Sequence, residues 1–202
     1  MARISIFPLA GAVLYPGLRL PLHIFEPRYR ALISDSLARD RRIGMIQPQS
    51  GEEGAPLYHV GCLGHIEDVE ALPDGRFNIV LEGLARFRVG RELVVSTPFR
   101  QVEAELFDEP EAEALAAVER ALFEREAHRF ADAHGYRVDW EQVQRLDDAA
   151  LINGVAQIAP FDAASKQVLL EAPKLAERCE LLVQLMQFYG KRDSDDNQAT
   201  LQ

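Results

Sequence analysis

Apolar and polar residues alternate along the first third of the chain, a period typical of strands. This pattern predicts one strand over residues 4–9 and a second from Leu18 to Ile24, separated by the tight turn Tyr15-Pro16-Gly17. The spacing then changes. Pro27 suits the first position of a helix, and the apolar residues after it recur at helical intervals over about residues 28–39. We therefore expect strand, turn, strand and helix in the opening of the chain.

The β pattern resumes after this helix. Residues 42–46 predict a short third strand, and Tyr58 to Ala71 predicts a longer one. The segment Leu72-Pro73-Asp74-Gly75 is a hairpin turn signal, and a strand of period two returns from Phe77. Gly83 interrupts that period, which favours a bulge that bends the strand around a barrel corner. A last strand is expected over residues 99–106, giving about six in all.

Helical spacing replaces alternation after residue 108. The pattern predicts a broad amphipathic helix over residues 110–133 and an irregular link at 136–140. An acidic cap at 147–148 then opens a helix that Pro160 ends, Asp162 caps a short one, and a final helix ends at Gly190. We expect a β subdomain over residues 1–107, a helical bundle over 108–190, and a disordered polar tail over 191–202.

Charge and composition narrow the function classes. Residues 1–106 hold 12 Lys and Arg against 13 Asp and Glu, whereas residues 107–202 hold 10 against 19. This balance leaves no basic footprint for nucleic acid. No run of about 18 apolar residues is present, so we expect no membrane span and a cytoplasmic protein. Cys62 and Cys179 stand far apart in sequence and outside any C-x-x-C pair, so we expect two buried thiols.

Recognisable catalytic motifs are absent. The sequence contains no phosphate-binding G-x-x-x-x-G-K-[ST] and no serine in a G-x-S-x-G elbow. Glu124, His128 and Asp132 recur every fourth residue on one predicted helix face, where a divalent metal could contact two of them, but a solvated face with intrahelical hydrogen bonds is the preferred interpretation. We therefore expect no enzyme activity, no bound metal and no cofactor.

Several motifs resemble one known family. The opening FPLAGAVLYPGLRLPLHIFEPRYRALI, the strand from Val60 to Ile66, the segment LEGLARFRV at 81–89 and the helix SKQVLLEA at 165–172, followed by Glu177-Arg178, are all similar to the amino-terminal substrate-recognition domain of Lon proteases. The resemblance implies an α+β fold, in which a PUA-like β pseudo-barrel of about six strands with one packed helix precedes a C-terminal helical bundle. It also implies a free-standing member that lacks the ATPase and protease domains.

The resemblance and the missing motifs together predict a non-enzymatic domain that binds polypeptide or protein clients, and by analogy with the family one that presents or regulates clients of proteolysis. The expected surface is an apolar groove between barrel and bundle, or a barrel edge that accepts an added strand. The candidate binding residues are Glu26, Arg28, Tyr29, Glu52 and Glu53.

Alternatives to this function stay open at the level of sequence. Glu26 has a purely structural interpretation, in which it accepts hydrogen bonds from the first turn of the helix and pairs with Arg30. The rival functions are a small-molecule- or metal-binding regulator that uses a barrel-mouth pocket, and a hydrolase with an unrecognised site. RNA binding is disfavoured by the acidic balance. The sequence predicts neither the client nor the oligomeric state.

Overall fold

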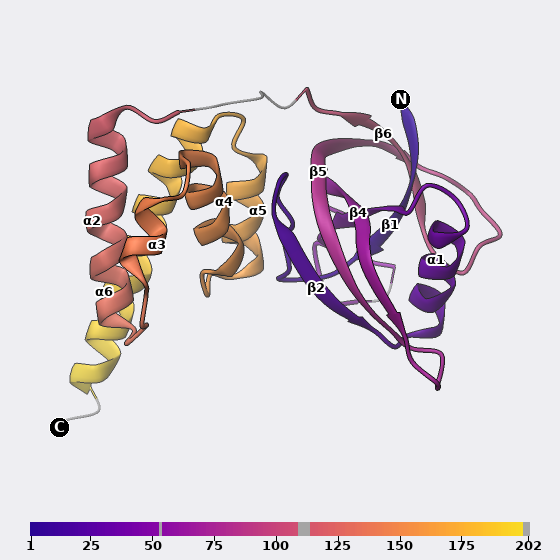
Figure 1. Ribbon diagram of the computed structural model, residues 1–202, viewed down its shortest axis with the longest axis horizontal. Helices are drawn as coiled ribbons and strands as arrows, with labels where there is room; N and C mark the ends of the chain where they lie inside the picture. The colour runs from indigo at the N-terminus through magenta and orange to yellow at the C-terminus, as the bar shows by residue number, and fades with distance from the viewer. Residues whose placement is uncertain (53, 109–113, 200–202) are drawn as a thin grey trace. The chain divides into compact units, whose positions relative to one another are not determined.

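The computed structural model describes residues 1–52, 54–108 and 114–199, with side chains up to residue 190. The chain divides into two compact units, Met1–Glu109 and Pro110–Gln202, which Figure 1 shows with their labelled elements. The first unit contains β1 (Ala2–Pro8), β2 (Arg19–Ile24), α1 (Pro27–Leu37), β3 (Arg42–Ile46), β4 (Val60–Ala71), β5 (Phe77–Glu92) and β6 (Gln101–Leu106).

The six strands form one mixed sheet that closes on itself. Their order is β2-β5-β4-β3-β1-β6, and β6 also pairs with β5, so five strands make a ring to which β2 adds on the outside of β5. The pairing of β1 with β3 is parallel and the other pairings are antiparallel. The predicted α+β fold with a pseudo-barrel of about six strands is confirmed.

Strand β5 belongs to two parts of the sheet because it bends next to Gly83. Its first half pairs with β2 and its second half with β6. The β4–β5 register shifts between the pairs Gly64–Gly83 and Leu63–Ala85, which is the predicted irregularity. A β-carbon on Gly83 would lie 2.0 Å from the Tyr15 carbonyl oxygen. Only glycine therefore lets the segment before β2 pass this close to the bend.

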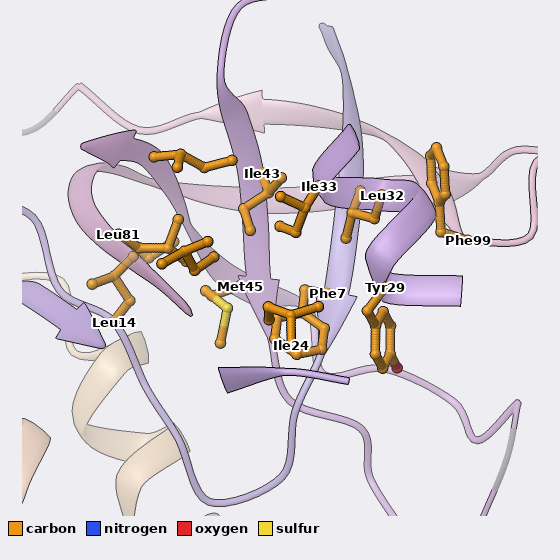
Figure 2. Packing of buried hydrophobic residues seen from close by; sticks show 13 residues of the cluster. Phe7, Leu14, Ile24, Tyr29, Leu32, Ile33, Ile43, Met45, Leu81 and Phe99 are labelled. Carbon is orange, nitrogen blue, oxygen red and sulfur yellow. The ribbon is translucent and has the colours of Figure 1, made fainter. Parts of the chain in front are cut away.

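Helix α1 packs on the barrel through one apolar face. Its side chains Tyr29, Leu32 and Ile33 are buried, as are Phe7 of β1 and Met45 of β3 in the same cluster, and Figure 2 shows these side chains gathered between helix and strands. A second cluster lies among β1, β3, β4, β5 and β6 and contains Ile4, Ile6, Ile46, Leu63, Phe87, Val102 and Ala104. The alternating pattern of the sequence thus supplies two cores, of which the first joins the end of β1 to the start of α1 through Phe7 and Tyr29.

The second unit is helical, with α2 (Ala117–Ala133), α3 (Trp140–Gln144), α4 (Asp148–Ile158), α5 (Ala163–Glu171) and α6 (Leu175–Ala199); α2 contacts α6 along its length. The predicted acidic caps are present, because Asp147 accepts a hydrogen bond from the Ala150 amide at 2.7 Å and Asp162 accepts one from the Ser165 amide at 2.7 Å. These bonds satisfy first-turn amides that would otherwise lack partners.

Three predicted boundaries in this unit are wrong. Helix α2 begins at Ala117, so residues 114–116 of the predicted helix lie before it, and residues 110–113 lie outside the described residues. At the start of α2 the Glu119 carboxylate accepts a hydrogen bond from the Ala116 amide. The expected irregular link ends in the short helix α3, which Asp139 caps. Helix α6 runs to Ala199, past Gly190, because residues 191–199 contain no proline or further glycine to break it.

Candidate functional site

A cleft of about 570 Å³ opens on the barrel unit where three separate segments meet. These are the end of β1, the start of α1, and the connection between β3 and β4, with Arg100 from the approach to β6 completing the wall. The described residues that line the cleft are Pro8, Leu9, Ala10, Glu26, Pro27, Arg28, Tyr29, Pro48, Ser50, Gly51, Glu52, Gly54, Ala55 and Arg100. Four of the five predicted site residues, Glu26, Arg28, Tyr29 and Glu52, therefore line one cleft.

The start of α1 supplies three of these four side chains. The guanidinium of Arg28 donates from Nε to Glu26 Oε2 at 3.0 Å, and its Cζ stands 4.7 Å from the centre of the Tyr29 ring. Tyr29 in turn packs edge-on against Phe7, with ring centroids 4.2 Å apart, and its hydroxyl donates to the Pro8 carbonyl at 3.4 Å. The buried ring of Tyr29 thus holds the more exposed Arg28–Glu26 pair at the mouth of the cleft.

The structural interpretation of Glu26 needs correction. Glu26 occupies the N-cap position of α1, but its side chain makes no capping hydrogen bond, and its ion pair is with Arg28 at 2.9 Å rather than with Arg30. Arg30 lies elsewhere, beside Gly75 in the turn between β4 and β5. The backbone of Glu26 is extended, so its side chain is not on the helix face that Arg30 occupies, and of these two arginines only Arg28 forms the observed ion pair.

The connection between β3 and β4 brings Glu52 to the cleft. The base of this loop is closed by backbone, since the Gln49 amide donates to the Pro56 carbonyl at 2.7 Å. Within the loop the Ala55 amide donates to the Glu52 carbonyl at 3.2 Å, and Glu52 itself is exposed. Glu53, the fifth predicted site residue, lies outside the described residues.

Arg100, which the sequence pattern does not mark, is a second arginine that lines the cleft. Its Nη1 donates to the Ala55 carbonyl at 2.9 Å, and its Nε and Nη2 donate to the two carboxylate oxygens of Glu92, both at 2.7 Å. Donation to the Glu92 carboxylate raises the pKa of Arg100, and the same hydrogen bonds lower the pKa of Glu92. No local pattern marked Arg100, because the strand pairings of β1 and β6 bring it to this place.

The lining of this cleft is chemically mixed. The described lining combines apolar surface with carboxylates and guanidinium groups, and it contains neither histidine nor cysteine. Among the described residues no group of three or more His, Cys, Asp or Glu is placed to hold a metal. Two of the three residues that recur every fourth position on α2 contact other side chains of the protein. Glu124 accepts a hydrogen bond from Arg120 at 2.9 Å, and His128 stacks on Trp140 with ring centroids 3.4 Å apart.

The edge of the sheet offers less to a partner than the cleft does. In the described part of the barrel unit, β2 is the strand at the open end of the sheet order. Pro21 stands in the middle of β2 opposite Val80 and supplies no amide hydrogen. A proline on an edge strand blocks continuous pairing with an added strand.

The described helices include none with the length and hydropathy that crossing a membrane requires.

Comparison with known proteins gives one consistent result. A family model described as the ATP-dependent protease La (LON) substrate-binding domain matches residues 3–187. Similar curated proteins include Lon protease of Salinispora arenicola, 32% identical over 194 residues, and Lon protease of Escherichia coli K12, 26% identical over 203 residues. Each alignment covers 91% of this chain but only 23% and 24% of those proteins. The chain thus spans about a quarter of the length of these relatives.

Solved structures agree on the fold. The chain is similar to a Lon N-terminal domain protein from Xanthomonas campestris, with a TM-score of 0.69 and 24% identity, covering 91% of this chain and 98% of that one. It is also similar to the N-terminal domain of Lon protease from the Mycobacterium avium complex, with a TM-score of 0.67 and 23% identity, covering 92% and 98%. At these identities the likeness concerns the arrangement of strands and helices.

Proposed function

The chain belongs to the Lon substrate-binding domain family, and we propose that it is a non-enzymatic domain that binds polypeptide clients through the cleft of its barrel unit. Family membership supports a role in substrate recognition. The observation that carries the finer proposal is the convergence of Glu26, Arg28, Tyr29 and Glu52, from two segments of the chain, on one cleft. On this proposal the domain presents clients to a proteolytic partner or regulates their delivery.

The cleft has the chemical groups that an extended polypeptide requires. The carboxylates of Glu26 and Glu52 can accept hydrogen bonds from client amides, and the guanidinium of Arg28 can donate to client carbonyls. Arg28 and Glu26 are 37% and 40% exposed, so their ion pair contributes little to stability and exchanges readily for contacts with a ligand. Pro8, Leu9 and Pro48 in the lining add apolar surface for a client side chain.

Binding can be measured by the fluorescence anisotropy of a labelled, permanently unfolded polypeptide such as reduced and carboxymethylated lactalbumin. We expect saturable binding to the wild-type protein, and Arg28→Ala should weaken it about three- to tenfold, because a contact of roughly 0.7–1.4 kcal/mol is removed. Truncation of Tyr29 is less informative, since that ring is only 8% exposed and belongs to the core.

Arg39→Ala is the matched control. Arg39 also pairs with a single carboxylate, Asp35 at 3.0 Å, is 69% exposed, and lies outside the cleft. It should leave binding unchanged. Equal affinity for wild type, Arg28→Ala and the double variant Arg28→Ala with Glu52→Ala would exclude the cleft as the client site, and the absence of any binding by the wild-type protein would refute the proposed function itself.

A further inference from the structure

One wall of the barrel cleft is a loop, residues 47–59 between β3 and β4. The loop closes its own base through backbone hydrogen bonds, such as that from the Tyr58 amide to the Gln47 carbonyl at 3.0 Å. Beyond this base the loop carries Glu52 to the cleft. Bonds at the base do not fix where the far part of the loop lies, so a contact from outside the loop matters for the shape of the cleft.

Arg100 makes such a contact from the segment that precedes β6. Its Nη1 donates to the Ala55 carbonyl at 2.9 Å, across 45 positions of sequence, and Ala55 is only 5% exposed. The backbone of Arg100 is itself held by the sheet, because the Ile6 amide of β1 donates to the Arg100 carbonyl at 3.0 Å. The loop is therefore tied to a fixed part of the barrel unit.

Glu92 sets the direction in which the Arg100 guanidinium points. This group is planar, and its Nε and Nη2 donate to the two carboxylate oxygens of Glu92, both at 2.7 Å. The edge formed by Nε and Nη2 lies opposite Nη1, so binding that edge to a carboxylate directs Nη1 away from Glu92 and toward Ala55. Glu92 ends β5 and pairs there with Val102 of β6, so its own backbone is also fixed.

We propose that Glu92 is a positioning residue for client binding, which acts through Arg100 on the loop wall of the cleft. The inference rests on the proposed function and deepens it by naming a residue that shapes the site from outside. Glu92 is not among the described residues that line the cleft. Without its carboxylate the guanidinium is free to turn, and the Ala55 carbonyl loses its donor. Client affinity then falls in proportion to the time that the loop spends away from its bound position.

The affinity of a Glu92→Ala variant for labelled, carboxymethylated lactalbumin tests this inference. We expect a loss of about three- to tenfold relative to the wild-type protein, the effect of one hydrogen bond from a charged donor. Glu92→Gln keeps one acceptor oxygen and should lose less. Arg100→Lys keeps the charge but not the planar fork, so it should lose about as much as Glu92→Ala.

Glu103→Ala is the matched control. Arg91 donates to the two carboxylate oxygens of Glu103 at 2.7 and 2.8 Å, so the same kind of pair joins β5 to β6 at a second place. Neither residue is among the described residues of the cleft lining. Glu103→Ala should therefore bind the unfolded polypeptide as the wild-type protein does.

Hydrogen exchange followed by mass spectrometry shows where each variant acts. In Glu92→Ala the amides of residues 47–59 should exchange faster than in the wild-type protein, while those of β1 and β6 should keep their wild-type rates. A general weakening of the sheet would instead speed exchange in the strands. Glu103→Ala should leave exchange in the loop unchanged.

The contrary outcomes differ from those of the cleft experiment. Wild-type affinity in Glu92→Ala, an equal loss in Glu103→Ala, full affinity in Arg100→Lys, or wild-type exchange of the loop in Glu92→Ala would each overturn the inference. If the unfolded polypeptide binds in an Arg28-dependent manner and Glu92→Ala leaves that binding intact, the proposed function stands and this inference fails. If the wild-type protein does not bind the polypeptide, the proposed function fails first.

Discussion

Replacement of Arg178 should strongly destabilise the helical unit. Arg178 lies on α6, is 5% exposed and joins three helices. Its guanidinium donates to Asn153 Oδ1 on α4 at 2.7 Å and to the carbonyls of Leu169 and Ala172 at the end of α5, both at 2.9 Å. Carbonyls at a helix end have no partner within the helix, so this one side chain satisfies the last turn of α5 and ties it to its neighbours.

The magnitude follows from these three bonds. Hydrogen bonds from a charged donor contribute about 1.5–3 kcal/mol each, but burying the guanidinium costs several kcal/mol. Because Arg178→Met relieves that cost while leaving two carbonyls and one amide oxygen without their donor, we expect a net loss of about 3–5 kcal/mol. With an m-value near 1.5 kcal/mol per molar, the urea midpoint should fall by about 2–3 M.

Equilibrium urea unfolding followed by Trp140 fluorescence and by far-UV circular dichroism measures this loss. Arg129→Met is the control, because Arg129 lies on α2 with its side chain 73% exposed and makes only a long ion pair with Glu126 at 3.7 Å; its cost should stay below about 1 kcal/mol. A midpoint for Arg178→Met within experimental error of the Arg129→Met midpoint would refute the reasoning.

Three further predictions concern the barrel bend, a helix cap and a thiol. Gly83→Ala should destabilise the barrel unit by at least about 2 kcal/mol, since the new β-carbon meets the Tyr15 carbonyl oxygen and the backbone must shift; chemical denaturation followed by circular dichroism measures this cost. Asp162→Ala should cost about 1 kcal/mol at neutral pH. The hydrogen bond from the Ser165 amide holds the pKa of Asp162 below its usual value. The extra stability of the wild-type protein over Asp162→Ala is therefore fully present above the unfolded-state pKa of about 3.9 and decreases as pH falls through the folded-state pKa. Urea titrations at a series of acidic pH values test this. Burial raises the pKa of Cys179 to about 11, so only about one thiol in a thousand is ionised at pH 8 and Ellman's reagent should label Cys179 only after denaturant is added.

Each of these predictions has a clear contrary result. Unchanged stability of the Gly83→Ala protein would mean that the approach of the Tyr15 carbonyl is not needed for the bend. A cost of Asp162→Ala that is constant from neutral pH to about pH 2 would show that the carboxylate form does not make the cap. Rapid labelling of native Cys179 would contradict its burial.

The sequence by itself predicts many of the helix starts and strand irregularities, because they depend on residues close together in the chain. Pro27 opens α1, Asp147 and Asp162 cap the helices that follow them, and the register irregularity lies beside Gly83, all as the pattern indicates. These features depend on backbone groups only a few positions apart, which a sequence displays directly. The same locality explains the misplaced start of α2 and the missed α3, since a side-chain bond decides the first and a five-residue helix has almost no period to detect.

The proposed binding surface was decided only by tertiary structure. The start of α1 drew attention because Glu26, Arg28 and Tyr29 are neighbours in sequence, whereas Arg100 joins them only through the pairing of β1 with β6. Hydrophobic periodicity indicates which face of an element is buried. Which residues pack against that face depends on contacts between segments that are distant in sequence, and a binding site consists of such contacts.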